Sequence, residues 1–204
     1  MTVPASTTPY SLSLQFTLSA EGMYSHDAGD PGGQTFCGIC MRDDPEWSGW
    51  PLVQKALASG TNPNTLYPVL ASSISDFYKK YWTYNNCEAI SLIHPALALL
   101  VFDMNVNDGA GGSAVIVQRI IGANPDGQLG PISLKLLASY LRGNGLVVLN
   151  ETINDVCKAH YDSIAQHTPS MKKFLQGWYN RIMNRQLFLQ SHFSGVAAVP
   201  SYKV

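Results

Sequence analysis

The chain has 204 residues, of which 46% are hydrophobic and 13% are charged. This composition is typical of one globular domain, or of a domain with two lobes, with ample apolar material for a core. The net charge is −1 at pH 7, and no cluster of Lys and Arg occurs in the sequence. Nucleic acid is therefore not an expected partner, because the chain lacks the cationic face that contacts phosphates.

Membrane and export signals are weak in this sequence. The longest apolar stretch, near residues 95–104, is too short to span a bilayer. The first Lys or Arg is Arg42, so the N-terminus lacks the basic segment of a signal peptide. We therefore expect a protein without a membrane span that is made in the cytoplasm. Action outside the cell would then need a separate release protein.

The four cysteines do not form a metal-binding pattern. Cys37 and Cys40 have the CxxC spacing, but the strand-to-helix context of a redox motif is not visible around them. Cys87 and Cys157 are isolated, and zinc would require a second close pair or histidines at ligand spacing. We expect free thiols and no bound metal, with a structural disulfide or an adventitious metal as the alternative.

The first apolar run, residues 10–21, has two readings. Leu14 and Leu18 lie four residues apart and would share one face of a helix, whereas alternation of apolar residues in the same run also fits a strand. We favour the helix. Gly22 is expected to end it, because glycine readily takes the left-handed conformation found after helix C-termini.

A turn-rich segment follows this helix. Residues 26–33 contain Gly, Asp and Pro and predict a tight turn that lets the backbone approach a ligand closely. Residues 34–39 predict a short strand of a small β-hairpin. Trp47 and Trp50 lie in the next loop, where they would either stack on sugar rings or fill the core.

The rest of the chain has helical periodicity. Helices are expected over residues 52–58, 66–81, 96–106, 113–121, 132–141, 144–166 and 171–193. The segment 96–106 is almost entirely apolar and predicts a buried central helix, and Ser113 is a plausible N-cap for the next one. The predicted fold class is mainly α, an α+β fold with a small β-hairpin near the active site and a helical second lobe.

Glu21 is the leading candidate for a catalytic acid. Cleavage of a glycosidic bond pairs a carboxylic acid that stays protonated with a carboxylate that stays ionised, and apolar surroundings raise the pKa of a carboxyl group. Of the four glutamates, Glu21 has an apolar helix before it and Met23 and Tyr24 after it. Glu46, between Pro45 and Trp47, is the second candidate.

Two further residues complete this candidate site. Asp30 lies in the polar loop nine residues after Glu21, where it would stay ionised and stabilise an oxocarbenium-like transition state or help to activate a water. Asp27 is the alternative for this role. The hydroxyl of Thr35 would hold a water on the far face of the sugar. Such a water would imply inversion, whereas closely spaced carboxylates would imply retention.

The same residues resemble a known family signature. The pattern of the glycoside hydrolase family 108 muramidases, E-G-G-Y, D-P-G-G-x-T and G-I, is similar to Glu21-Gly22, Tyr24, Asp30-Pro31-Gly32-Gly33, Thr35 and Gly38-Ile39. Segments that resemble later motifs of the family follow in the right order at residues 77–82, 101–109, 118–131 and 174–181. The resemblance covers roughly residues 12–185.

The resemblance implies a lysozyme-like fold and cleavage of the β-1,4 bond between N-acetylmuramic acid and N-acetylglucosamine. It implies Glu21 as the catalytic acid, and a likeness to phage lysozymes of the Glu-Asp-Thr type supports Asp30 and Thr35. No cofactor is implied. The expected partner is bacterial peptidoglycan, reached from the bacterial host's cytoplasm through a holin or an export protein, as for a phage endolysin or a bacterial autolysin.

The resemblance also suggests how the chain is divided. Residues 1–9 are expected to form a loose arm and residues 10–95 a catalytic lobe. Residues 96–204 would form a helical lobe that resembles the family's peptidoglycan-binding region. No linker separates the two lobes, so we expect one continuous domain, and a monomer.

Four polar residues are candidates for substrate binding. They are Tyr24, Asn105, Asn107 and Gln118. In a cleft they would bind acetamido and hydroxyl groups, but they would equally serve to cap helices or satisfy buried backbone. Asp103 lies within the apolar helix and requires a partner, for which Arg181 and Arg119 are candidates.

Two departures from the family pattern leave other functions open. Met23 replaces the second glycine after the glutamate, and Asp108 stands where a histidine is expected. They motivate a second hypothesis, a non-catalytic wall-binding or virion structural protein on a lysozyme scaffold. A chitinase-like glycosidase is the third hypothesis.

Overall fold

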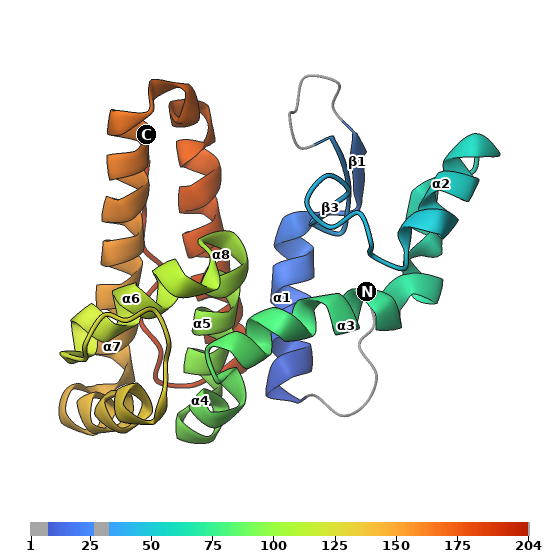
Figure 1. The fold of residues 1–204 in the computed structure, drawn as a ribbon. Coiled ribbons are helices and arrows are strands. Elements are labelled where there is room, and N and C mark those ends of the chain that lie inside the picture. The colour runs from blue at the N-terminus through green and yellow to red at the C-terminus, as the bar shows by residue number, and fades with distance from the viewer. Residues whose placement is uncertain (1–7, 27–32, 204) are drawn as a thin grey trace. The chain divides into compact units, whose positions relative to one another are not determined.

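The computed structural model describes residues 8–26 and 33–203 (Figure 1). Its elements are α1 (Pro9–Glu21), β1 (Tyr24–His26), β2 (Gln34–Phe36), β3 (Ile39–Cys40), α2 (Trp50–Ala58), the 3-10 turn η1 (Pro63–Leu66), α3 (Tyr67–Tyr84), α4 (Cys87–Ile93), α5 (Pro95–Asn107), α6 (Ala110–Ile121), α7 (Pro131–His167), η2 (Pro169–Phe174) and α8 (Leu175–His192). The predicted class, mainly α with a small antiparallel sheet, is confirmed.

The described residues form two compact units. The first, Leu14–Lys80, is called the N-terminal unit here. The second, the C-terminal unit, consists of residues 81–203 together with residues 8–13. Each is described by itself below.

The helix interpretation of the first apolar run is correct. Helix α1 ends at Glu21, and Gly22 follows with φ of 75°, the left-handed conformation expected after a helix. Leu14, Phe16 and Leu18 are buried, and so is Thr17 between them. Because more than one side of the helix is buried, its sequence shows little helical periodicity, and this explains why a strand also fitted the pattern.

The predicted hairpin is present and has a third strand. The sheet has the order β1-β2-β3, and both neighbouring pairs are antiparallel. Phe36 faces Ile39 across the two-residue turn formed by Cys37 and Gly38, whose φ angles are 50° and 79°. Positive φ at both central residues is the requirement of a type I′ turn, which matches the twist of the flanking strands.

The two loop tryptophans belong to the core of the N-terminal unit. Trp47 and Trp50 are both buried and pack edge to face, with ring centroids 5.3 Å apart. Their indole N–H groups donate to the carbonyl oxygens of Ser73 (3.3 Å) and Asp44 (2.9 Å). Of the two roles left open by the sequence, filling the core is the one observed, since the polar edge of each ring is already paired.

The C-terminal unit is organised around α5. All ten residues from 96 to 105 are buried, as predicted for the central helix. Helices α4 and α6 pack against α5, and α8 lies beside α7 (Figure 1). Helix α4 was not predicted, because its seven residues are too few to show a clear period.

Several helix boundaries differ from those predicted. Helix α6 begins at Ala110, so Ser113 is an interior residue and not the N-cap, and its hydroxyl donates back to the Ala110 carbonyl (2.9 Å). The two helices predicted over 132–141 and 144–166 form α7, which is interrupted at Gly145 by a non-helical φ of 82°. The last predicted helix begins as the 3-10 turn η2.

Helix α7 is the one helix of the described residues that is long and apolar enough to cross a bilayer by length and composition alone. Its most apolar 18 residues have a mean hydropathy of 1.2, and 17% of them are buried. The absence of a membrane span stays a prediction.

A buried ion cluster ties α5 to α8. Asp103 accepts from Arg181 (Nη2, 2.8 Å; Nε, 3.1 Å) and from Arg185 (Nη1, 3.2 Å). The pairing with Arg181 confirms one of the two partners expected for Asp103, whereas Arg185 was not foreseen. Arg185 also donates to Asn154 Oδ1 (3.0 Å) on α7, so the cluster joins three helices.

His94 caps the N-terminus of the central helix. Its Nδ1 accepts a hydrogen bond from the backbone N–H of Ala96 at 3.1 Å. Burial lowers the pKa of His94 below its ordinary value of 6.5, because a protonated ring would lose solvation. Protonation would also remove the lone pair that accepts from Ala96.

The first prediction concerns this cap. Because the pKa of His94 is lower in the folded state, the unfolded chain binds the proton first on acidification. The stabilising effect of the neutral His94 cap is therefore complete above about pH 6.5 and is lost as the pH falls below that value. His94→Asn should keep the cap and remove this loss, so lowering the pH from 7.5 to 5.5 should reduce the free energy of unfolding of the variant less than that of wild type. Urea unfolding at pH 7.5 and pH 5.5 measures the difference, and parallel losses in both proteins would contradict it.

The second prediction concerns the ion cluster. Asp103→Asn leaves the buried guanidinium group of Arg185 and the partly exposed one of Arg181 without their counter-charge, and it should lower the free energy of unfolding by about 3 kcal/mol or more. Asp43→Asn is the matched control, because Asp43 pairs with Arg42 on the surface and its loss should not be measurable. Urea unfolding followed by tryptophan fluorescence compares the two. Equal stability of the Asp103 variant and wild type would rule out the structural role.

Candidate active site

Glu21 is positioned by the end of helix α1. It is the last helical residue and is half-buried. A Cβ atom on Gly38 would lie 2.8 Å from both Cγ and Oε2 of Glu21. The carboxyl group therefore lies against the β2–β3 turn, at a position that any side chain on residue 38 would occupy. Glycine is required there for its positive φ and for the space that it leaves.

Tyr78 reaches the same turn from helix α3. Its side chain is 1% exposed, and its hydroxyl donates to the Cys37 carbonyl oxygen at 2.7 Å. The hydroxyl oxygen would lie 2.6 Å from a Cβ atom on Gly38. The backbone N–H of Cys37 donates to the Met23 carbonyl oxygen (3.2 Å). The turn is thus held by Tyr78 on one side and by the residues that follow Glu21 on the other.

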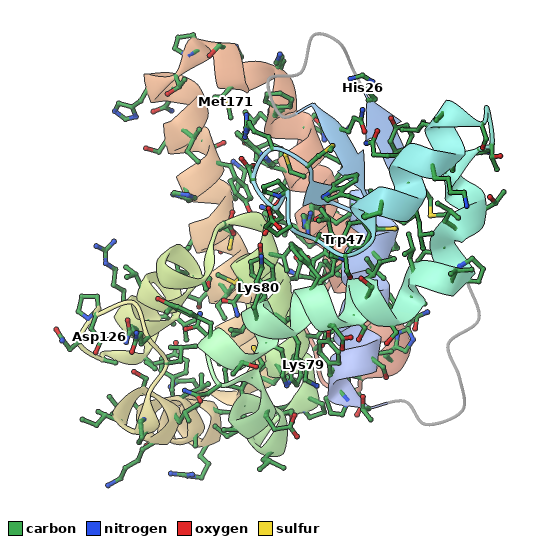
Figure 2. All side chains as sticks on the ribbon, turned by 45° about the vertical axis from the view of Figure 1, so that its right-hand side comes forward. His26, Trp47, Lys79, Lys80, Asp126 and Met171 are labelled. Carbon is green, nitrogen blue, oxygen red and sulfur yellow. The ribbon has the colours of Figure 1, made fainter. Side chains whose placement is uncertain are left out.

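Thr35 and Tyr24 lie on the strands next to this turn. Thr35 is half-buried in β2, opposite Ser25 of β1 and Cys40 of β3. Tyr24 is half-buried at the start of β1, and its backbone N–H donates to Asn64 Oδ1 (3.0 Å). Figure 2 shows His26 at the other end of the same strand. Glu21, Tyr24 and Thr35 thus all belong to the N-terminal unit. Tyr24 is paired with Phe36, so its side chain lies on the opposite face of the sheet from that of Thr35.

The structure does not describe the two candidates for the second carboxylate. Asp30 and Asp27 lie outside the described residues. Glu46, the second candidate for the acid, is exposed at an open hollow of about 430 Å³ whose walls also include Asp43, Asp44 and Asp76. Glu21 has the more enclosed position of the two glutamates.

Asn105 and Gln118 are fully buried in the C-terminal unit. Asn105 Nδ2 donates to the Tyr81 carbonyl (2.9 Å), and its Oδ1 accepts from Asn85 and Ser113. The side chain of Gln118 binds three consecutive residues, 126–128, of the loop between α6 and α7. It donates to Asp126 (2.7 Å) and accepts from the Gly127 N–H (3.0 Å), and Figure 2 shows Asp126 in this loop. Direct contact with a substrate would require these hydrogen bonds to break.

Asn107 belongs to a polar cluster with Asp108 and Tyr161. Its Nδ2 donates to Asp108 Oδ1 (2.9 Å) and to Tyr161 Oη (2.8 Å), and the Tyr161 hydroxyl donates to both oxygens of Asp108 (2.9 and 3.1 Å). Desolvation raises the pKa of Asp108, and the hydrogen bond from Tyr161 opposes that shift. From the sequence, Asp108 was notable only as a departure from the family pattern, and Tyr161 was not singled out for a site.

Gly38 and Tyr78 are the site residues that sequence reasoning missed. In the sequence both were noted only as parts of segments that resemble family motifs, without a role of their own. The signal for Gly38 was its place in a two-residue turn between short strands, which demands positive φ. Tyr78 had no comparable signal, because its contact with Cys37 spans 41 residues of sequence.

The cysteines near the site are free thiols, as are Cys87 and Cys157, which confirms the expectation. Burial raises the pKa of the Cys37 thiol to about 12, so it stays protonated at neutral pH. Within the described residues, no group of three His, Cys, Asp or Glu side chains could hold a metal ion.

Two stretches of the chain match known family models. Residues 14–109 match the family model described as glycosyl hydrolase 108, and residues 112–183 match one described as a predicted peptidoglycan domain. A search of curated protein sequences found no match. Among solved structures, the structure of Brucella abortus SagA is similar, with a TM-score of 0.64 and 19% sequence identity over 91% of this chain and 97% of that chain. At this identity the likeness shows the fold alone.

The two family models together support a glycoside hydrolase that acts on the peptidoglycan of the cell wall. The first match includes Glu21, the β2–β3 turn and Tyr78, and the second lies within the C-terminal unit. The resemblance seen in the sequence motifs is thereby confirmed: residues 14–109 of this chain match the family model of glycosyl hydrolase 108.

Proposed function

We propose that the protein is an N-acetylmuramidase that cleaves the β-1,4 bond between N-acetylmuramic acid and N-acetylglucosamine, with Glu21 as the general acid. The observation that carries the proposal is the position of Glu21, half-buried at the end of α1 and against a turn that leaves room for its carboxyl group. A general acid must be held within hydrogen-bond reach of the leaving oxygen, and a side chain fixed by a helix end and a sheet turn meets that need.

Asp30 and Thr35 are proposed as the partners of Glu21. Thr35 is half-buried in the sheet that begins three residues after Glu21, where its hydroxyl would hold the attacking water. In the sequence, Asp30 lies four residues before Gln34, the first residue of strand β2, which also contains Thr35. An ionised Asp30 would stabilise the positive charge that develops on the sugar, or help to activate that water.

The proposed substrate contacts fall into two groups. Tyr24 and Asn107 are half-buried and would bind sugar substituents directly. Asn105 and Gln118 would act indirectly, since their buried amide groups are already bonded to the Tyr81 carbonyl and to residues 126–128 of the loop after α6. We further propose residues 10–95 as the catalytic lobe and residues 96–204 as the lobe that contacts peptidoglycan.

The cellular route is part of the proposal. As a bacteriolytic enzyme of phage or bacterial origin, the protein would reach the wall with the help of a holin or an export protein. The family match to a peptidoglycan domain supports the wall as the place of action.

The third prediction tests the acid. Glu21→Gln keeps the size of the side chain and removes its proton donor, so the rate of muropeptide release should fall on the order of a hundredfold or more. Purified peptidoglycan is digested with each protein, and the reducing ends are identified by mass spectrometry. Muramic acid reducing ends from the wild type, lost in the variant, are the expected result.

Two further variants give this test its controls. Glu151→Gln changes an exposed glutamate of α7 and should leave the rate unchanged. Glu46→Gln tests the second candidate for the acid. If Glu46→Gln is inactive and Glu21→Gln is active, the assignment of the acid is wrong. A folded wild type that binds peptidoglycan without releasing muropeptides would support a wall-binding protein, and cleavage of chitin oligomers alone would support the chitinase-like alternative.

A further inference from the structure

We propose that Tyr78 is a positioning residue for Glu21, and that it acts through the turn formed by Cys37 and Gly38. The inference rests on the proposed function, since it concerns the placement of the general acid. It assigns a role in the reaction to a side chain of α3 that lies 57 positions after the acid in the sequence.

The first argument is the way in which Tyr78 is held. The ring is buried, packs edge to face against Phe77 at 5.3 Å, and points its hydroxyl at the carbonyl oxygen of Cys37 (2.7 Å). A buried tyrosine hydroxyl that is directed at a turn carbonyl fixes the position of that turn relative to its own helix. The turn needs such support, because Cys37 is a non-glycine residue at φ of 50°.

The second argument is the convergence on Gly38. Tyr78 Oη and Glu21 Oε2 would lie 2.6 Å and 2.8 Å from the same point, the site of a Cβ atom on residue 38. The hydroxyl and the carboxyl group therefore flank one small space beside the turn. A movement of the turn would displace the groups on both of its sides.

The third argument is chemical. A tyrosine hydroxyl has one hydrogen, and that of Tyr78 is directed at the Cys37 carbonyl. Toward a carboxyl group the oxygen therefore presents lone pairs. Such an oxygen suits a neighbour that carries a proton, as a general acid does before it protonates the leaving group.

The fourth prediction tests this role with two variants. Tyr78→Phe keeps the ring and removes the hydroxyl, and it should lower kcat about tenfold on soluble peptidoglycan fragments while KM changes less than twofold. Gly38→Ala places a methyl carbon within 2.8 Å of the Glu21 side chain and 2.6 Å of the Tyr78 hydroxyl, so that these groups must shift. It should lower kcat about a hundredfold, the scale expected for a misplacement of about 1 Å. A purely structural defect would lower the melting temperature without this selective loss of kcat.

Gly60→Ala is the matched control for Gly38→Ala. Gly60 has φ of 71°, close to that of Gly38, but a Cβ atom there would meet nothing within 4 Å. Both alanine variants carry a comparable backbone strain, but only Gly38→Ala adds a steric clash. Gly60→Ala should therefore show the fall in melting temperature that the strain alone causes, with wild-type kcat. If Gly38→Ala does not fold, Tyr78→Phe alone decides the test.

The outcomes separate this inference from the proposed function. Glu21→Gln is assayed on the same fragments. If Glu21→Gln is inactive but Tyr78→Phe has wild-type kcat, the acid stands and the positioning role of Tyr78 is overturned. If Glu21→Gln retains wild-type kcat, the assignment of the acid fails, whatever Tyr78→Phe shows. Loss of kcat in Glu21→Gln, Tyr78→Phe and Gly38→Ala, with Gly60→Ala unaffected, supports both.

Discussion

A carboxyl group can lie against a backbone turn only where that turn has no side chain in its way. The N-terminal unit meets this constraint at Gly38. The turn, the short strands and the end of α1 are arranged around this residue. The two-residue turn needs positive φ, the short strands bring the turn to the end of α1, and Gly22 ends the helix at Glu21. A larger residue at position 38 would require the acid or the turn to move.

The C-terminal unit depends on a different kind of interaction. Its central helix carries a fully buried aspartate, whose charge is balanced by two arginines from α8. Such a cluster adds little net stability compared with an apolar core of equal volume, but it penalises any arrangement that leaves one charge alone. Through Arg181, Arg185 and Asn154 the cluster links α5, α7 and α8.

The sequence was informative where local chemistry dominates. The apolar run at residues 96–106 predicted the buried α5, and Glu21 followed by Gly22 predicted the helix end. Boundaries such as the start of α6 were wrong because Ser113 suits a cap but lies where helix packing continues. The contact between Tyr78 and the turn could not be predicted, because it depends on tertiary packing and not on periodicity. The roles of Asp30 and Thr35 remain predictions.

The burial of the cysteines has a consequence for a protein that works at the cell wall. Thiols that leave the cytoplasm meet oxidants and other disulfides, and only the thiolate attacks them. Burial raises the pKa of Cys37, Cys87 and Cys157, so three of the four thiols are both shielded and kept protonated. Cys40 is only half-buried. Oxidative damage would therefore begin at one position, on the outermost strand β3, and would leave the interiors of both units intact.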